Sequence, residues 1–152
     1  MKKTFFVLIL SIVSLAVSAQ FVASREVKEN IPGLCNKKEV YVLFPIDGQV
    51  EAVCPLTKQE LLNKLNKDVT FITNNPKYKD HGMIEVIINC KGEVVWCQMD
   101  GNGKTKSPEL DKQIEGVFNS LGLWKVGTLD DQKVDSSRLF SFKIVKGVFE
   151  WE

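Results

Sequence analysis

Apolar residues recur at helical spacing in two stretches of the chain, and capping signals mark where each helix begins. In the first stretch, Thr57 and Glu60 form a capping box, in which each side chain accepts a hydrogen bond from the other residue's backbone N–H. The apolar residues that follow share one face: Leu61, Leu62 and Leu65. The pattern predicts a helix over 58–66 that packs on another element.

The second stretch has a longer apolar face and signals at both ends. Ser107 is expected as the N-cap, Pro108 at the first helical position and Gly122 as the C-terminal cap. The apolar residues at helical spacing are Leu110, Ile114, Val117, Phe118 and Leu121. The sequence therefore predicts a helix over 108–121 whose apolar face covers a sheet.

Alternation of apolar and polar residues predicts three strands, over 83–90, 93–99 and 138–145. The first two flank the turn Cys90-Lys91-Gly92 and should pair as an antiparallel hairpin. The expected register places these residues on one apolar face: Ile84, Val86, Ile88, Cys90, Val95, Cys97 and Met99. Trp96 then falls on the opposite face, either exposed or packed on the N-terminal residues.

Nearer the N-terminus, two β-prone runs flank Asp47-Gly48, a dipeptide typical of tight turns, so a β-hairpin is expected over 40–53. Polar loops are expected around Asn74-Asn75-Pro76 and Asp130-Asp131. Together these elements predict an α+β fold. Two helices would pack on one face of a small antiparallel β-sheet, with an additional N-terminal β-hairpin.

The first 19 residues have the pattern of a cleavable signal peptide. Lys2 and Lys3 precede an apolar run of about 13 residues, which is shorter than the roughly 20 that a membrane-spanning helix needs. Val17-Ser18-Ala19 supplies the small residues that signal peptidase prefers, so cleavage after Ala19 is expected, with no membrane span afterwards. An uncleaved anchor is the alternative. Export would place the mature protein in the periplasm or outside the cell.

Cleavage would leave 133 residues, which suits an N-terminal extension over 20–54 followed by one domain over 55–152. It would also remove two of the 20 basic residues and none of the 19 acidic ones, for a net charge of about −1. Phosphate recognition needs a concentrated basic face, whereas the lysines here are scattered among acids. No nucleic-acid partner is therefore expected.

Four cysteines lie in the exported part of the chain: Cys35, Cys54, Cys90 and Cys97. An oxidising compartment favours disulfides, and four cysteines allow three pairings. We predict Cys54 with Cys90, because a helix antiparallel to the next strand would bring Cys54 near that strand's far end; Cys35 and Cys97 would then be paired or free. Cys90 and Cys97 should not pair, since they lie about 13 Å apart along the hairpin. Buried free thiols are the main alternative.

No arrangement typical of catalysis is found, so no enzymatic activity, cofactor or bound metal is predicted. His81 is the single histidine, far in sequence from every cysteine, and no C-x-x-C pair or G-x-S-x-G elbow occurs. Asp100-Gly101-Asn102-Gly103 is similar to part of a calcium loop, but Asp111 stands where such a loop has a bidentate Glu. We therefore expect a turn at this place.

Short segments follow one another in a characteristic order: Leu56-Thr57-Lys58-Gln59-Glu60-Leu61-Leu62, Gly82-Met83-Ile84-Glu85-Val86, Asn89-Cys90-Lys91-Gly92-Glu93-Val94, Ser107-Pro108-Glu109-Leu110-Asp111, Trp124-Lys125-Val126-Gly127 and the run Phe140 to Ile144. In this order they resemble the C-terminal domain of TonB-type energy transducers, over about residues 55–149. The resemblance is especially to the versions found in Bacteroidetes-like bacteria. Trp124-Lys125-Val126-Gly127 corresponds to the family's Trp-Lys-Pro-Gly, with Val126 in place of the proline. A long Pro-rich spacer, which such transducers carry, is missing from this chain.

The resemblance implies a binding module that captures an extended peptide, such as the TonB box of an outer-membrane receptor, by β-strand addition beside its last strand. The corresponding residues here are Arg138, Leu139, Phe140, Ser141, Phe142, Lys143, Ile144 and Val145. The partner would be a protein or peptide of the envelope. Charges at Lys143 and Lys146 are also typical of an edge strand that takes no partner. The alternative function is a structural or assembly component of the envelope, which could form homodimers through an edge strand.

Overall fold

The computed structural model of the protein describes residues 21–152; the expected signal peptide and its cleavage site fall on residues 1–20, outside the described residues. The elements in chain order are β1 (Ala23–Glu26), β2 (Glu39–Val42), β3 (Gln49–Val50), α1 (Lys58–Asp68), α2 (Thr70–Asn74), β4 (Asp80–Ile88), β5 (Val94–Met99), the 3-10 turn η1 (Gly101–Gly103), α3 (Pro108–Asn119), β6 (Thr128–Leu129), β7 (Gln132–Lys133), β8 (Ser136–Val145) and β9 (Val148–Trp151). Within residues 21–152, no helix is long and apolar enough to cross a membrane.

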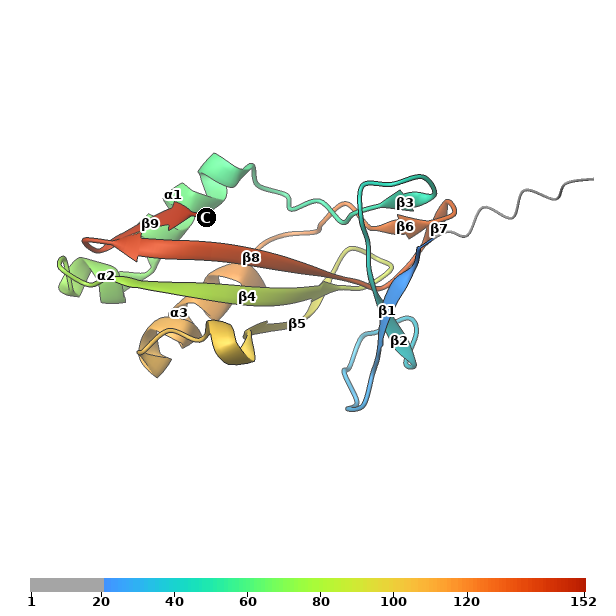
Figure 1. The fold of residues 1–152 in the computed structure, drawn as a ribbon, viewed down its shortest axis with the longest axis horizontal. Helices are drawn as coiled ribbons and strands as arrows, with labels where there is room; N and C mark the ends of the chain where they lie inside the picture. Colours follow the sequence, from blue (N-terminus) through green and yellow to red (C-terminus); the bar gives the residue numbers. More distant parts are fainter. Residues whose placement is uncertain (1–20) are drawn as a thin grey trace, which may run out of the picture.

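The main sheet is built around two long strands, β4 and β8, which pair antiparallel along their whole length. Its strand order is β1-β2-β8-β4-β5, and β9 pairs with β8 as well (Figure 1). All pairings are antiparallel except the short parallel contact between β2 and β8. The fold is therefore α+β, as expected from the sequence, with one parallel contact that the sequence did not reveal.

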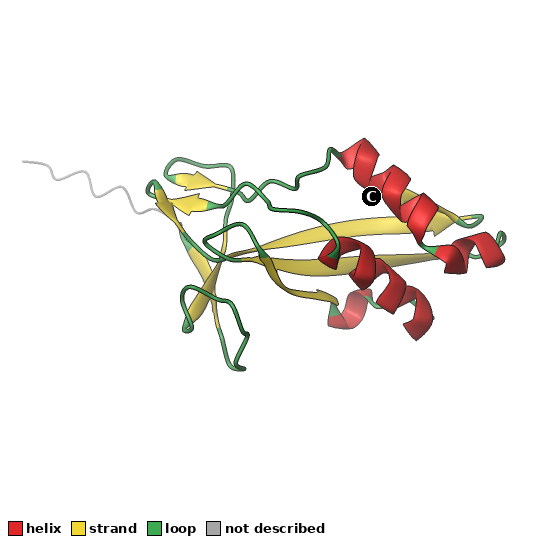
Figure 2. Cartoon of the chain, turned by 180° about the vertical axis from the view of Figure 1, so that it is seen from behind, coloured by secondary structure: helices red, strands yellow, loops and turns green. Residues whose placement is uncertain are grey.

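The helices gather on one face of the main sheet, as Figure 2 shows. Helix α1 contacts β9, and α3 contacts β5 and α1. The expected capping box at Thr57 and Glu60 is present, and Ser107 caps α3 with Pro108 in its first turn. The expected cap at Gly122 is wrong: α3 ends at Asn119, and Ser120 is its C-cap.

The larger core cluster lies between the helices and the sheet. Its strand residues include Ile84, Val86, Ile88, Cys97 and Met99, on the face expected from the sequence. Val95 departs from that expectation because the β4–β5 register shifts between Ile87 and Ile88, so that Val95 has no place in the regular alternation. It packs instead on the other face, in a second cluster with Leu34, Val40, Ile87 and Trp96.

The expected N-terminal hairpin over 40–53 is wrong. Strand β2 pairs with β1 and β8, whereas β3 pairs with β6 in a separate three-stranded sheet, β3-β6-β7. The turn at Asp47-Gly48 does form, with a φ of 78° at Gly48, but β3 is only two residues long and pairs antiparallel with β6 rather than with β2. The N-terminal residues thereby cover the second face of the sheet beside Ile87 and Trp96.

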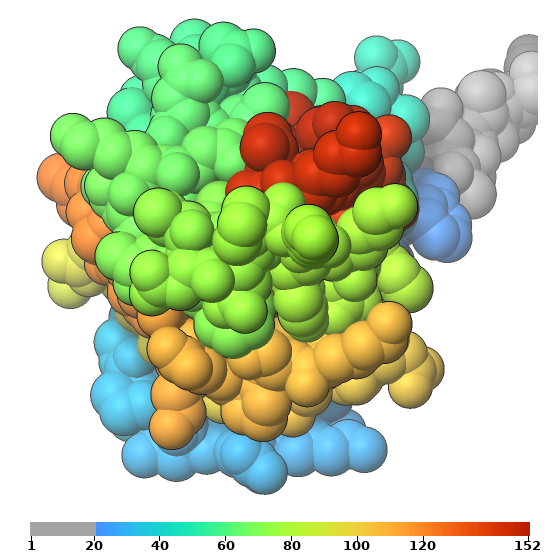
Figure 3. Space-filling model, turned by 90° about the vertical axis from the view of Figure 1, so that its left-hand side faces the viewer, coloured from blue at the N-terminus to red at the C-terminus, as the bar shows by residue number. Residues whose placement is uncertain are grey.

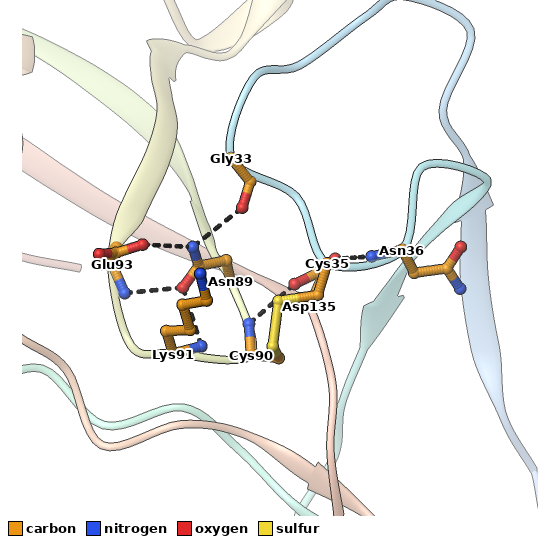
Figure 4. Close-up of a disulfide and its surroundings, with 8 residues drawn as sticks. All are labelled: Gly33, Cys35, Asn36, Asn89, Cys90, Lys91, Glu93 and Asp135. Carbon is orange, nitrogen blue, oxygen red and sulfur yellow. Dashed lines mark hydrogen bonds between the residues drawn. A yellow bond between two sulfur atoms is a disulfide. The ribbon is translucent and has the colours of Figure 1, made fainter.

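The disulfide joins Cys35 to Cys90, with a Cα–Cα distance of 6.1 Å, so the expected Cys54–Cys90 pairing is wrong. Asn89 donates to the backbone carbonyl of Gly33 at 3.0 Å, which holds the 33–36 loop against the β4–β5 turn (Figure 4). The carboxylate of Asp135 accepts the N–H groups of Asn36 and Cys90 at 2.6 and 2.8 Å. These contacts bring Cys35, rather than Cys54, to Cys90. Cys54 and Cys97 are free thiols.

At the other end of the molecule, a carboxylate anchors the start of β4. Asp80 accepts hydrogen bonds from the Tyr78 hydroxyl at 2.7 Å and from the backbone N–H groups of His81 and Lys106 at 3.0 and 2.9 Å. Burial by itself raises the pKa of Asp80, but these three donors outweigh it and lower that pKa below its ordinary value. Burial, with help from Asp80, raises the pKa of Tyr78 to about 12.

Candidate functional site

The exposed edge of β8 is interrupted rather than continuous. On this edge β2 pairs with Ser136 and Ser137, and β9 pairs with the four residues from Phe142 to Val145. Residues 138–141, which we call the β8 gap, pair with no strand of residues 21–152 on this side, although Glu152, just after β9, bonds the carbonyl of Ser141. In Figure 1, β9 lies along one end of β8 and β2 lies at the other. The gap spans about 13 Å at the rise of a strand.

The pairing on either side of the gap shows which backbone groups point outward. Tyr41 donates its N–H to the carbonyl of Asp135 at 2.9 Å, and Glu152 donates to the carbonyl of Ser141 at 3.4 Å. Because backbone groups alternate between the two edges of a strand, the odd-numbered residues of β8 face this edge and the even-numbered ones face β4. Among residues 21–152, no group pairs with the N–H and C=O of Leu139 or with the N–H of Ser141, so these are the open groups of the gap.

The expectation that the whole strand 138–145 is a terminal edge strand is therefore wrong for its second half. Phe142, Lys143, Ile144 and Val145 already pair with β9, the last strand of the described chain. The sequence does hold a signal for β9. Lys146-Gly147 forms the turn with φ values of 53° and 70°, and apolar and polar residues alternate after it. Figure 3 shows the surface at this end, with the β8–β9 turn among residues of α2 and the start of β4.

Side chains from the helices close two other edges of the sheet. Asn66 of α1 accepts the backbone N–H of Phe149 at 2.8 Å and donates to the carbonyl of the same residue at 3.3 Å. Its carboxamide thus takes the place of a neighbouring strand beside β9. On β5, Glu115 of α3 accepts the N–H of Met99 at 3.0 Å. These caps reduce pairing with other chains at β9 and β5 and leave the β8 gap uncapped.

The outer edge of β1 is a second open edge. Val27 donates to the carbonyl of Lys38, so Arg25 faces β2 and the backbone groups of Ser24 and Glu26 face outward. No strand within residues 21–152 pairs with this side of β1. The strand is only four residues long and carries two adjacent charges, features typical of a protected edge.

Two hollows flank the β8 gap. The first, of about 290 Å³, is lined by Val42, Leu43, Phe44 and Leu139 and by two ion pairs, Arg25–Glu85 at 2.9 Å and Arg138–Glu51 at 2.5 Å. The second, of about 250 Å³, is lined by Phe140, Ser141, Trp151, Lys58 and Glu152. Arg138 and Leu139 line both, so the two hollows meet at the open backbone groups.

Phe140 connects the second hollow to the core. Its ring lies 5.2 Å from that of Phe118, 5.9 Å from Trp124 and 6.1 Å from Trp151, measured between ring centroids. The indole N–H of Trp151 donates to the carbonyl of Lys58 at 3.0 Å, which fixes this ring beside α1. The gap therefore borders a rigid aromatic cluster that is partly open to solvent.

Four other features were expected from the sequence: His81, the segment from Asp100 to Gly103, and the thiols of Cys54 and Cys97. His81 is exposed near the start of β4. Asp100-Gly101-Asn102-Gly103 forms the expected turn, and Asp111 accepts the hydroxyl of Thr105 at 2.6 Å. Burial raises the pKa of the Cys97 thiol to about 12, and burial likewise raises that of Cys54.

Among residues 21–152, one group of potential metal ligands comes together, made up of Cys35, Cys90 and Asp135. Both sulfur atoms belong to the disulfide, and both carboxylate oxygens of Asp135 accept backbone N–H groups. We assign this cluster the structural role of fastening the 33–36 loop to the sheet.

Comparison of the chain with protein-family models, with curated proteins and with solved structures finds no match in any of the three.

Proposed function

We propose that this protein is an extracytoplasmic binding module that captures an extended segment of an envelope protein by adding it as a short strand to the β8 gap. The observation that carries the proposal is the set of open backbone groups at Leu139 and Ser141. They lie between two paired regions of one strand and beside two hollows. Unpaired donors and acceptors of this kind are what strand addition uses.

The geometry limits the bound segment to three or four residues in contact with β8. A residue placed opposite Leu139 can exchange two hydrogen bonds with it, and the N–H of Ser141 can add a third when Glu152, which donates to the Ser141 carbonyl, moves aside. A longer pairing would have to displace β9, whose Phe149 is fully buried and held by Asn66. We therefore propose a short strand with side-chain contacts in the hollows, rather than a ligand along all of 138–145.

The resemblance to the C-terminal domain of TonB-type transducers supports the same mode of binding. The order of the helix after Thr57, the hairpin of β4 and β5, the helix after Ser107 and the long strand β8 agrees with that resemblance. An outer-membrane receptor is a candidate partner on this basis. The proposal concerns binding of a peptide and not transmission of force.

Export to the periplasm or the cell exterior forms part of the proposal. The pattern of the first 19 residues supports it, with cleavage after Ala19. The Cys35–Cys90 disulfide also supports it, because disulfides persist in oxidising compartments and are rare in the cytosol.

A structural component of the envelope is the second candidate, and the open outer edge of β1 favours it. A second copy of the chain could extend the main sheet there, through the backbone groups of Ser24 and Glu26. Dimerisation that is concentration-dependent and abolished by Ser24→Pro, with no peptide binding at β8, would support this candidate instead.

The experiment is a selection of random heptapeptides on the immobilised mature protein, followed by titration of each selected peptide in solution. Leu139→Pro removes an outward N–H without breaking the bonds to β4, because proline is tolerated where the N–H faces away from the ladder. The matched control is Ser141→Ala, which keeps the backbone donor. We expect peptides to bind the wild type and the control and to lose at least tenfold in affinity on Leu139→Pro, about 1.4 kcal/mol. Equal binding to all three proteins would refute strand addition at the gap.

A further inference from the structure

We infer that the captured segment carries an apolar side chain that packs in the hollow between Phe140 and Trp151, and that these two rings set the specificity of the site. This inference rests on the proposed function, since it concerns the peptide bound at the β8 gap. Three observations carry it: the face on which Phe140 lies, the arrangement of the rings, and the balance of charge around them.

The register assigns one ligand residue to this hollow. Side chains directly opposite one another on neighbouring strands share a face of the sheet. Phe140 lies on the helix side, where it contacts Phe118, whereas Leu139 is 55% exposed on the other side. A ligand residue opposite Leu139 therefore points away from the helices. Its neighbour opposite Phe140 points toward the rings of Phe140 and Trp151.

The ring surfaces in this hollow are held in place before any ligand arrives. Phe140 packs against three aromatic neighbours, and Trp151 is fixed by its hydrogen bond to the carbonyl of Lys58. Both side chains are only partly buried, so apolar surface remains open next to the unpaired backbone of the gap. Rigid aromatic surfaces lose little entropy on binding and commonly dominate the energetics of an interface.

The charges around the hollow favour a neutral side chain. Arg138 is already paired with Glu51, and Lys58 and Glu152 carry opposite charges on the rim of the same hollow. The positive and negative groups therefore balance, which leaves no net charge for an acidic or basic ligand residue to complement. An apolar residue fits both the rings and this balance.

The test is a double-mutant cycle with a heptapeptide obtained by the selection above. Each peptide position is replaced by alanine in turn, and each peptide is titrated against the wild type and Trp151→Ala. We expect one peptide position at which alanine weakens binding to the wild-type protein by about fivefold to tenfold. The same peptide substitution should weaken binding to the Trp151→Ala protein by less than about twofold. Val148→Ala is the matched control on the same strand, at a site 49% exposed. Each alanine substitution in the peptide should weaken binding to this variant by the same factor as it weakens binding to the wild type.

The outcomes separate this inference from the proposed function. Binding that is lost in Leu139→Pro but shows no coupling to Trp151 would overturn the inference and leave strand addition standing. Tighter binding of peptides with Asp or Lys at the coupled position would overturn it as well. Trp151→Phe keeps an aromatic ring in β9 and serves as the test if Trp151→Ala does not fold. Its coupling energy with the peptide position should lie between those of the wild type and Trp151→Ala. A wild-type protein that binds no selected peptide would overturn both proposals.

Discussion

Removing the Cys35–Cys90 disulfide should lower the free energy of unfolding by about 4 kcal/mol. The two cysteines are 55 residues apart in the sequence, so the bond closes a long loop in the unfolded chain. In the chain-entropy model, a loop of this length removes about 14 cal/mol/K of entropy from the unfolded state, which is about 4 kcal/mol at 25 °C.

The folded state should change much less than the unfolded state when this bond is absent. Asn89 still holds the carbonyl of Gly33, and Asp135 still accepts the N–H of Asn36. The 33–36 loop should therefore remain against the β4–β5 turn. Most of the loss should come from the greater freedom of the unfolded chain, which also raises the dependence of stability on denaturant.

The assay is equilibrium urea unfolding of the wild type and of the Cys35→Ser/Cys90→Ser variant, followed by tryptophan fluorescence. Cys54→Ser is the control, since its thiol is free and should contribute nothing to loop closure. We expect the double variant to unfold at lower urea concentration with a steeper slope. A difference below about 1 kcal/mol, with an unchanged slope, would refute the reasoning that this bond constrains the unfolded chain.

Three further predictions concern the buried face of α3, the loss of stability at low pH and the two free thiols. Phe118→Ala should cost about 3–5 kcal/mol in urea unfolding because the ring is fully buried, and a loss below about 1 kcal/mol would contradict its place in the core. Asp80 has a lowered pKa when folded, so it stabilises the fold above its unfolded pKa of about 4 and this contribution is lost as pH falls through the folded pKa. Asp80→Asn should flatten the stability profile below about pH 4, and an unchanged profile would argue against the three hydrogen bonds. With iodoacetamide at pH 8, peptide mapping should show slow labelling of Cys54 and labelling of Cys97 only after unfolding; rapid modification of Cys97 in the native protein would contradict its burial.

Elements with strong local signals were predictable from the sequence. The capping box at Thr57 and the Ser107-Pro108 pair each fix a helix start through residues three or four positions away, and both helices begin there. The β4–β5 turn was predictable for the same reason. Gly92 has a φ of 88°, and a Cβ there would lie 2.3 Å from the carbonyl oxygen of Trp124, so the turn requires glycine.

Pairings between distant segments were not predictable, because alternation shows which face a strand buries but not which strand lies beside it. Strand β2 was assigned to a hairpin with the next run, yet it joins β8, which begins about 95 residues later. The disulfide pairing was unpredictable for the same reason. Cys35 reaches Cys90 through the 33–36 loop, and the position of that loop depends on contacts with the distant residues Asn89 and Asp135.

The candidate site was partly predictable. The sequence indicated that 138–145 is a strand near the end of the chain, and residues 138–141 do lie at an open edge. Strand β9 was not among the elements expected from the sequence, although Lys146-Gly147 followed by alternating residues is a hairpin signal. Which backbone groups face outward depends on the pairing with β2 and β9, and therefore on contacts across the whole fold.

The central claim, that the backbone of Leu139 and Ser141 is open and receives a peptide strand, is tested most directly by residue-resolved amide hydrogen exchange. In the free protein, the amides of Leu139 and Ser141 should exchange quickly, while those of Phe140 and Phe142, which face β4, should be protected. Addition of a selected heptapeptide should protect Leu139 and Ser141 and leave Ser24 and Glu26 of β1 unchanged. Slow exchange at Leu139 in the free protein, or protection by the peptide that appears at β1 rather than at the β8 gap, would contradict the account.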